Sequence, residues 1–170
     1  ERRAFPAGQQ RLALARAIVD RANPLTRRVV VNWVWQHHLG RGLVRSPDDF
    51  GTQGEPPTHP QLLDYLASTF ADQGWSLKKL HRRIMLTSVY RQAALEDSAA
   101  RLVDPHNRLL WRMPRRRLEM EAMRDAMLAV AGRLDTAMGG RPFQLFGEPS
   151  TPRRTVYGLV NRHTIPSMFS

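Results

Sequence analysis

Apolar residues recur at helical spacing in five segments of the chain, and each segment predicts a helix. In residues 9–20, Leu12, Ala15 and Val19 form one stripe flanked by arginines. Positions three and four residues apart lie on the same face of a helix. The pattern therefore predicts a first amphipathic helix that packs through this stripe.

A second helix is expected to begin at Asn23 and Pro24 and to end before Gly40. Asparagine caps free amide groups, proline suits the first helical position, and glycine is typical of a helix end. We expect this helix to lie at the centre of the fold. Its buried face is expected to consist of Leu25, Val29, Val30, Trp33 and Val34.

Residues 40–60 hold too many breakers for a continuous helix or a central strand. Loops of this length are uncommon inside compact domains and often carry function. Burial of Leu43, Val44 and Phe50 would instead make the segment a structural clamp, which is the interpretation we favour. We expect a long ordered loop, and its breakers are Gly40, Gly42, Pro47, Gly51, Gly54, Pro56, Pro57 and Pro60.

Two helices are expected to follow this loop as a hairpin. Thr58 and Gln61 match a capping box at the start of the first helix, which continues to Gly74. Ser76 suits the cap of the second helix. The expected inward side chains are Leu63, Leu66, Ala67 and Phe70 of the first helix and Leu77, Leu80 and Ile84 of the second.

A fifth helix is expected over residues 118–131. Its stripe is rich in methionine, which is more typical of flexible core packing than of a cofactor site. Residues 155–160 favour a short strand or hairpin arm near the C-terminus. The sequence thus predicts a mainly α fold with about five helices in an irregular bundle. The stripe of the fifth helix consists of Met120, Met123, Met127 and Val130.

Length and composition predict a single helical domain over residues 1–170. Hydrophobic residues make up 42% and charged residues 24% of the chain, as in ordinary globular proteins. No apolar stretch approaches the roughly 20 residues that span a bilayer. The absence of cysteine excludes disulfides, thiolate zinc sites and covalent haem attachment in this segment. From its first and last residues we expect an incomplete fragment of a larger multidomain protein.

The chain is strongly basic, with a formal net charge of +11. All its cationic residues except Lys78 and Lys79 are arginines. A positive surface attracts polyanions or acidic protein faces. Arginine also forms bidentate pairs with carboxylates, so many of these side chains are equally suited to internal pairing.

Six histidines raise the question of a metal site, but the pattern assigns no metal ligand. His37 and His38 are adjacent, so their side chains diverge by about 100 degrees on a helix, which argues against a shared ion. At most one of them could join a histidine from elsewhere in the chain. Those histidines are His59, His81, His106 and His163.

Asp49 follows Asp48 in the loop rich in glycine and proline, a setting in which general acids and bases occur. A carboxylate that only caps the loop is the alternative. An enzyme hypothesis would combine His37 or His38 with Asp49 and Arg117 in a hydrolase-like or metal-assisted site. No phosphate-binding loop, dinucleotide fingerprint or nucleophile elbow occurs, so no named enzyme class is supported.

Arg115, Arg116 and Arg117 precede the fifth predicted helix, where positive charge opposes the helix dipole. Nearby glutamates, a bound anion or a carboxylate from another segment would compensate. We favour internal carboxylates over a nucleic-acid patch, because aromatic residues are only 8% and no nucleic-acid module pattern occurs. The candidates for binding anions or carboxylates are Arg112, Arg115, Arg116, Arg117, Arg153 and Arg154.

Several stretches together carry a family resemblance. Residues 31–44 read VNWVWQHHLGRGLV, and the further stretches are DFG at 49–51, GWSLK at 74–78, Asp104-Pro105 with residues 107–112, and RRTVY at 153–157. On these stretches the chain resembles a planctomycete-type domain of unknown function, family 1553 of such domains, over nearly its whole length.

The resemblance implies the C-terminal part of large exported proteins that also carry a cytochrome c-like haem domain and a second uncharacterised domain. Haem c is then expected elsewhere in the full-length protein, with no cofactor in this segment. The implied location is outside the cytoplasm, in the periplasm or cell envelope. No catalytic residues carry over from the family.

We therefore expect a helical accessory or interaction module with no assignable catalytic activity. Its expected partners are other domains of the same polypeptide or an acidic protein face. The enzyme hypothesis around residues 40–60 is the alternative. Binding of an anionic polysaccharide or nucleic acid through the arginine patches is the second alternative, with nucleic acid disfavoured.

Overall fold

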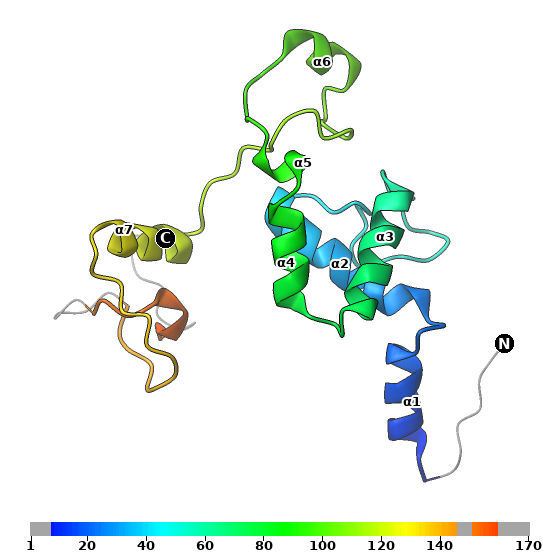
Figure 1. Cartoon of the computed structure of the whole chain (residues 1–170), viewed down its shortest axis with the longest axis horizontal. Coiled ribbons are helices and arrows are strands. Elements are labelled where there is room, and N and C mark those ends of the chain that lie inside the picture. The colour runs from blue at the N-terminus through cyan, green and yellow to red at the C-terminus, as the bar shows by residue number, and fades with distance from the viewer. Residues whose placement is uncertain (1–7, 146–150, 160–170) are drawn as a thin grey trace. The chain divides into compact units, whose positions relative to one another are not determined.

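The computed structural model describes residues 8–145 and 151–159 of the chain. The chain divides into two compact units, residues 1–115 and residues 116–170, and each is described by itself (Figure 1). The mainly α fold class is confirmed. The expectation of one domain over the whole chain stays a prediction.

All five expected helices are present among the described residues, together with two short ones that have no apolar period to signal them. Asp97 caps one of the short helices and Thr87 the other. The first unit contains α1 (Gln10–Val19), α2 (Pro24–Leu39), α3 (Pro60–Asp72), α4 (Leu77–Met85), α5 (Ser88–Arg91) and α6 (Ser98–Val103), and the second contains α7 (Met120–Val130) and the 3-10 helix η1 (Thr155–Tyr157).

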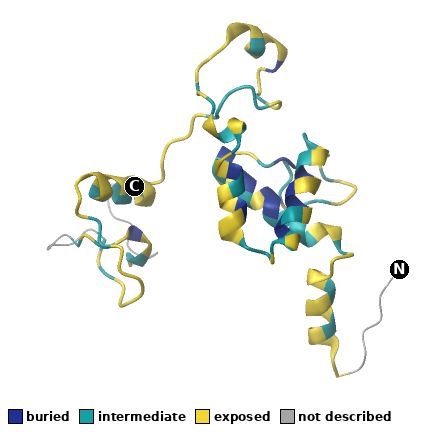
Figure 2. Ribbon diagram, in the orientation of Figure 1, coloured by how far each residue is buried: buried dark blue, intermediate teal, exposed yellow. Residues whose placement is uncertain are grey.

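The core of the first unit lies between α2, α3 and α4, and Figure 2 shows the buried residues gathered there. Two side chains of the 40–59 loop, Leu43 and Val44, are buried with the helices, and Phe50 packs against them. The expected burial of Leu43 and Val44 is therefore confirmed, and Phe50 is partly buried. The remaining core residues are Val31, Trp35, Leu39, Leu63, Leu66, Ala67, Phe70, Leu80 and Ile84.

The buried face of α2 differs from the expected one. Trp33 is 46% exposed and Leu25 is 48% exposed, whereas Val31, Trp35 and Leu39 are buried. Residues 29–31 are all valine, so the apolar period alone does not select a face. The loop determines which face of α2 is buried, because it packs on the side of α2 that carries Asn32.

Asn32 joins α2 to the loop through a fully buried amide side chain. Its Oδ1 accepts a hydrogen bond from the backbone N–H of Val44 at 2.9 Å, and its Nδ2 donates to the carbonyl oxygen of Val44 at 3.0 Å. A Cβ at Gly42 would lie 2.6 Å from Nδ2 and 2.4 Å from the Val44 carbonyl oxygen. This close approach requires glycine at position 42.

The hairpin of α3 and α4 forms as expected, with two local differences. Ser76 caps α4 by accepting a hydrogen bond from Lys79, but Leu77 is exposed. The expected capping box at Thr58 is wrong, since α3 begins after His59 with Pro60 in its first turn. Thr58 instead bonds the carbonyl oxygen of Leu43 through both its backbone N–H and its hydroxyl, which fastens the end of the loop.

The apolar stripes of the first and last expected helices are not buried in the described structure. The apolar residues of α1 lie around its whole circumference and include exposed Leu12 and Val19. In α7, Met127 is 66% and Val130 92% exposed. The side of α7 that packs within its unit carries Arg124 and Asp125 instead, because these bind the backbone and hydroxyl of the η1 region.

The expected strand at residues 155–160 is replaced by η1, and Val160 lies outside the described residues. Pairing of β type in the described part of the second unit consists of two isolated bridges, Asp135 with Arg153 and Phe143 with Gly158. Within the described ranges, the helices are too short or too polar to cross a bilayer.

We predict that Asn32→Leu lowers the free energy of unfolding by about 3 kcal/mol, because the buried N–H and C=O of Val44 lose their partner. Urea unfolding at neutral pH measures this difference. Gln61→Leu, the same kind of change at an exposed position of α3, should alter stability by less than about 0.5 kcal/mol. Equal stability of Asn32→Leu and the wild type would contradict the stabilising role of the hydrogen bonds between Asn32 and Val44.

Candidate functional site

Of the two adjacent histidines, His38 forms a hydrogen bond with a histidine of another helix. His38, at the end of α2, places its Nε2 atom 2.7 Å from Nδ1 of His81 on α4. The two rings meet edge to face at 5.0 Å, and His38 meets the ring of Tyr90 at 5.5 Å. His37 is exposed on the neighbouring side of α2. The two adjacent side chains diverge, as helical geometry requires.

Asp49 uses its carboxylate within its own loop. Its Oδ1 accepts the backbone N–H of Gly51 at 2.7 Å, and its carbonyl oxygen accepts the hydroxyl of Ser46 at 2.9 Å. A Cβ at Gly54 would lie 2.1 Å from that same carbonyl oxygen. The arrangement is that of a loop cap. Within residues 8–145 and 151–159, no group of three or more His, Asp or Glu is placed to hold a metal ion.

Arg112 and Arg115 serve the segment that precedes α7. The guanidinium of Arg112 lies over the ring of Trp111 at 5.1 Å and 3.8 Å from a carboxylate oxygen of Glu96. Arg115 donates to the carbonyl oxygen of Ala94 at 3.1 Å. Both side chains therefore act within the first unit, one through a carboxylate and a ring and the other through the backbone.

Asp104 is a buried carboxylate that no site hypothesis included, although it belongs to one of the stretches of family resemblance. Its Oδ2 accepts the N–H of Leu109 at 2.7 Å, and its carbonyl oxygen accepts the indole N–H of Trp111 at 2.9 Å. Burial raises the pKa of Asp104, but backbone hydrogen bonds from Leu109, Arg108 and His106, that of Leu109 foremost, outweigh burial and hold the pKa below its usual range. Asp104 is thus a structural anchor for the turn.

Arg116 and Arg117 are exposed residues of the second unit. They lie further from the helix than expected, since the N-cap of α7 is Glu119 and its first turn carries Glu121. These two glutamates complement the dipole of α7, because negative charge is favourable at a helix N-terminus. The charge conflict expected at this helix start is therefore removed by position and by acidic neighbours.

Arg153 and Arg154 take different roles. Arg153 donates to the carbonyl oxygens of Gly139 and Arg141, and its guanidinium lies over the ring of Tyr157 at 4.7 Å. Arg154 is exposed. Arg153 thus holds two segments of the second unit together through the backbone, which its fork of several donors makes feasible.

Arg124 and Asp125 form a half-buried polar node on α7 that sequence reasoning missed. Arg124 donates to the carbonyl oxygen of Arg153 and to the hydroxyl of Thr155, each at 3.0 Å. Asp125 accepts the N–H of Thr155 at 2.8 Å and its hydroxyl. In an amphipathic helix the pattern predicts that the apolar stripe is buried and that charged residues face solvent. The sequence therefore does not indicate that Arg124 and Asp125 pack within the unit.

The contacts of this node lower the pKa of Asp125. Burial raises the pKa, but the hydrogen bonds from Thr155 outweigh burial, and the positive charges of Arg124 and Arg154 add to them. The net result is a pKa of Asp125 below its usual range. The carboxylate is therefore ionised at neutral pH and stabilises the η1 region.

A groove on α4 gathers positive charge that the sequence-predicted site does not include. We define the cationic groove by its lining residues, and it is a shallow, open groove of about 440 Å³. These residues are Gln73, Lys79, Arg82, Arg83, Leu86 and Thr87. Arg83 is held in place because it donates to the hydroxyl of Tyr65 at 2.6 Å and lies over the Tyr65 ring. Lys78 lies on the same face of α4, since positions four residues apart share a face.

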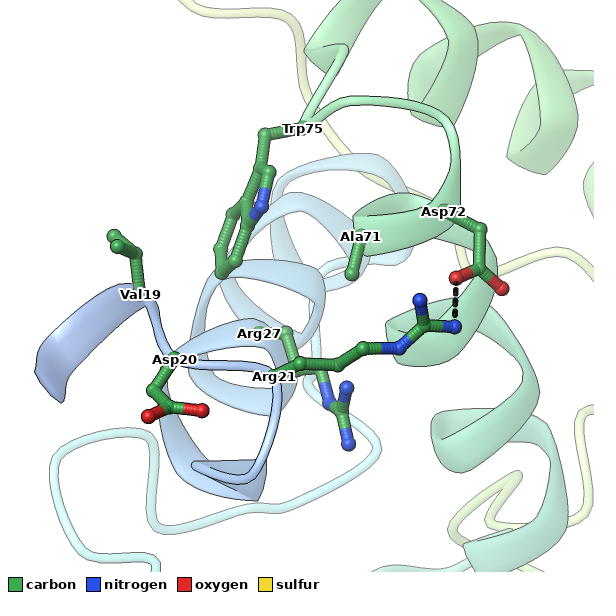
Figure 3. Close-up of a pocket in the computed structure, with 7 residues that line it drawn as sticks. All are labelled: Val19, Asp20, Arg21, Arg27, Ala71, Asp72 and Trp75. Atoms are coloured by element: carbon green, nitrogen blue, oxygen red, sulfur yellow. Dashed lines mark hydrogen bonds and ion pairs between the residues drawn. The ribbon is translucent and has the colours of Figure 1, made fainter. Parts of the chain in front are cut away.

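A smaller pocket of about 140 Å³ lies between the start of α2 and the end of α3. Figure 3 shows its wall formed by Trp75 and its ion pair between Arg21 and Asp72, whose atoms are 2.7 Å apart. Its lining holds two acids and two arginines, and its volume corresponds to a few water molecules. It therefore gives no charge preference or room for a sizeable ligand.

The fold and the groove define a basic, mainly helical protein module whose long loop is locked to its central helix. The chain belongs to the family PSD1, described as Protein of unknown function (DUF1553), whose model matches residues 10–170. The resemblance found in the sequence is thereby confirmed. No curated protein and no solved structure matches the chain.

We predict that Asp125→Asn lowers the stability of the η1 region at neutral pH by about 1–3 kcal/mol, through weaker hydrogen bonds to Thr155. Because the folded pKa lies below the ordinary value of 3.8, this contribution is present above that value and is lost as the pH falls through the folded pKa. The difference between wild type and variant should therefore shrink below roughly pH 4.

Hydrogen exchange of the Thr155 amide measures this effect, since all four tryptophans lie in the first unit and fluorescence would not report it. Asp48→Asn, the same change at an exposed position of the loop in the first unit, is the control, for which we expect no change in the exchange of the Thr155 amide at any pH. A difference that does not depend on pH would contradict the role of the ionised carboxylate.

Proposed function

We propose that this chain is a non-catalytic helical interaction module that binds an acidic protein segment in the cationic groove of α4. The observation that carries the proposal is the set of cations on α4. Within the described part of the chain, Lys78, Lys79 and Arg82 form no ion pair with any carboxylate. Their charges are thus available to an external partner.

Other arginines of the first unit behave differently. Arg28 lies 2.6 Å from a carboxylate oxygen of Asp64, and Arg21 pairs with Asp72, so these cations join α2 and its approach to α3. The face of α4 that bears the groove has no acidic residue, since residues 77–86 contain none. The concentration of uncompensated charge on α4 is therefore a local property and not only a result of the net charge.

The groove also has an apolar part, which narrows the class of partner. Leu86 lines it and is 60% exposed, and Met85 beside it is exposed as well. An amphipathic acidic segment would place carboxylates against the cations and an apolar side chain against Leu86. A single-stranded nucleic acid would need aromatic stacking platforms, and none of the described residues that line the groove is aromatic.

The family resemblance supports a place for this module in a larger exported protein with a cytochrome c-like domain. In this proposal the acidic segment belongs to another domain of the same polypeptide or to an acidic protein, and haem c is bound outside residues 1–170. The enzyme hypothesis gains no support from the loop, because the carboxylate of Asp49 is engaged in its own turn.

We predict that Lys79→Glu with Arg82→Glu weakens binding of an amphipathic peptide of glutamate and leucine by about tenfold or more, since like charges then face each other. Fluorescence anisotropy of the labelled peptide measures the affinity, which should fall as salt rises. Arg11→Glu with Arg16→Glu makes the same charge change at exposed positions of α1 and should bind nearly as tightly as wild type.

Circular dichroism of each variant checks that the helices are retained. Equal loss of affinity in both double variants would show a nonspecific effect of net charge and would refute the groove. Tighter binding of a heparin fragment or an oligonucleotide than of the peptide, lost in the α4 variant alone, would assign the groove to an anionic polymer instead.

A further inference from the structure

The hydrogen bond between His38 and His81 brings two metal-binding atoms to one point at the surface of the first unit. Nε2 of His38 and Nδ1 of His81 face each other at 2.7 Å, although they belong to different helices. A hydrogen bond between two imidazoles needs a proton on only one of the facing nitrogens. The other nitrogen already presents its lone pair toward the shared point.

We propose that His38 and His81 bind one divalent transition-metal ion of the class that prefers imidazole, namely Zn²⁺, Cu²⁺ or Ni²⁺. The imidazole that donates in the hydrogen bond changes tautomer, and its proton moves through solvent to its other ring nitrogen. Both facing nitrogens then hold lone pairs, and two N–metal bonds form without a net change in protons. This site is independent of the acidic partner proposed for the groove.

The geometry needs only a small adjustment. Two nitrogens bound tetrahedrally to zinc at roughly 2.0–2.1 Å are about 3.4 Å apart, so the rings must separate by roughly 0.7 Å. His81 is exposed and can make this movement without disturbing the core. His38 is half-buried and is oriented by the edge of the Tyr90 ring, so it supplies the fixed side of the site.

The surroundings predict an open site of modest affinity. Within the described ranges no third His, Asp or Glu completes a metal-binding group, so water would occupy the remaining positions. Lys78 and Arg82, on either side of His81 in the sequence, add positive charge that opposes a cation. A tightly bound structural zinc, which takes four protein ligands, is not expected here.

Titration of the full chain with zinc chloride by calorimetry tests the proposal. We expect about one ion per chain, with His81→Gln weakening binding by about tenfold or more. His37→Gln is the matched control, because His37 is adjacent to His38 but diverges from it on α2, and its binding should equal that of wild type.

Electron paramagnetic resonance with Cu²⁺ gives a second measurement that does not depend on affinity alone. We expect coupling to two imidazole nitrogens in the wild type and to one in His81→Gln. His38→Gln should also reduce the coupling to one, provided that circular dichroism shows the helices retained. Zinc binding unchanged in His81→Gln, absent from the wild type, or lost in His37→Gln would each overturn the proposal.

Discussion

The buried amide of Asn32 is the constraint on which the first unit depends. A buried backbone N–H and C=O must find partners, and in Val44 both are satisfied by this one side chain. The loop is thereby held against α2. The carbonyl oxygen of Leu43 in turn accepts hydrogen bonds from Thr58, which lies just before α3. The contact between Asn32 and Val44 thus fixes which face of α2 is buried. Through the loop it also fixes the position at which α3 begins.

The sequence predicted the helices better than their packing, and Asn32 explains the difference. Caps act locally, so Asn23 and Ser76 identified the starts of α2 and α4. The buried face of α2 depends on a residue 12 positions away in sequence, and a polar side chain within an apolar run reads as exposed. The same reason applies to α7, where Arg124 and Asp125 face the η1 region while the methionine stripe stays exposed.

The sequence also did not predict which cations bind within the fold and which do not. The difference follows the chemistry of the two side chains. Arginine presents several donors in a planar fork, and here Arg115, Arg124 and Arg153 use it to bind backbone carbonyl oxygens. Lysine is a flexible point charge with less use for such bridging. The only two lysines of the chain both lie on α4, beside the groove whose cations pair with no carboxylate among the described residues.

The histidine pair follows from the same packing that the Asn32 clamp secures. Leu39 follows His38 directly on α2, and Leu80 precedes His81 on α4, so the buried neighbours of both histidines belong to one core. Their side chains cannot drift apart freely, because the leucines fix the two helices where the imidazoles meet. An ion bound between them would connect α2 to α4 at the surface, whereas Asn32 connects α2 to the loop inside. The first unit would then be stabilised by two polar contacts, the buried hydrogen bonds of Asn32 and a metal site at the surface whose remaining ligands are water.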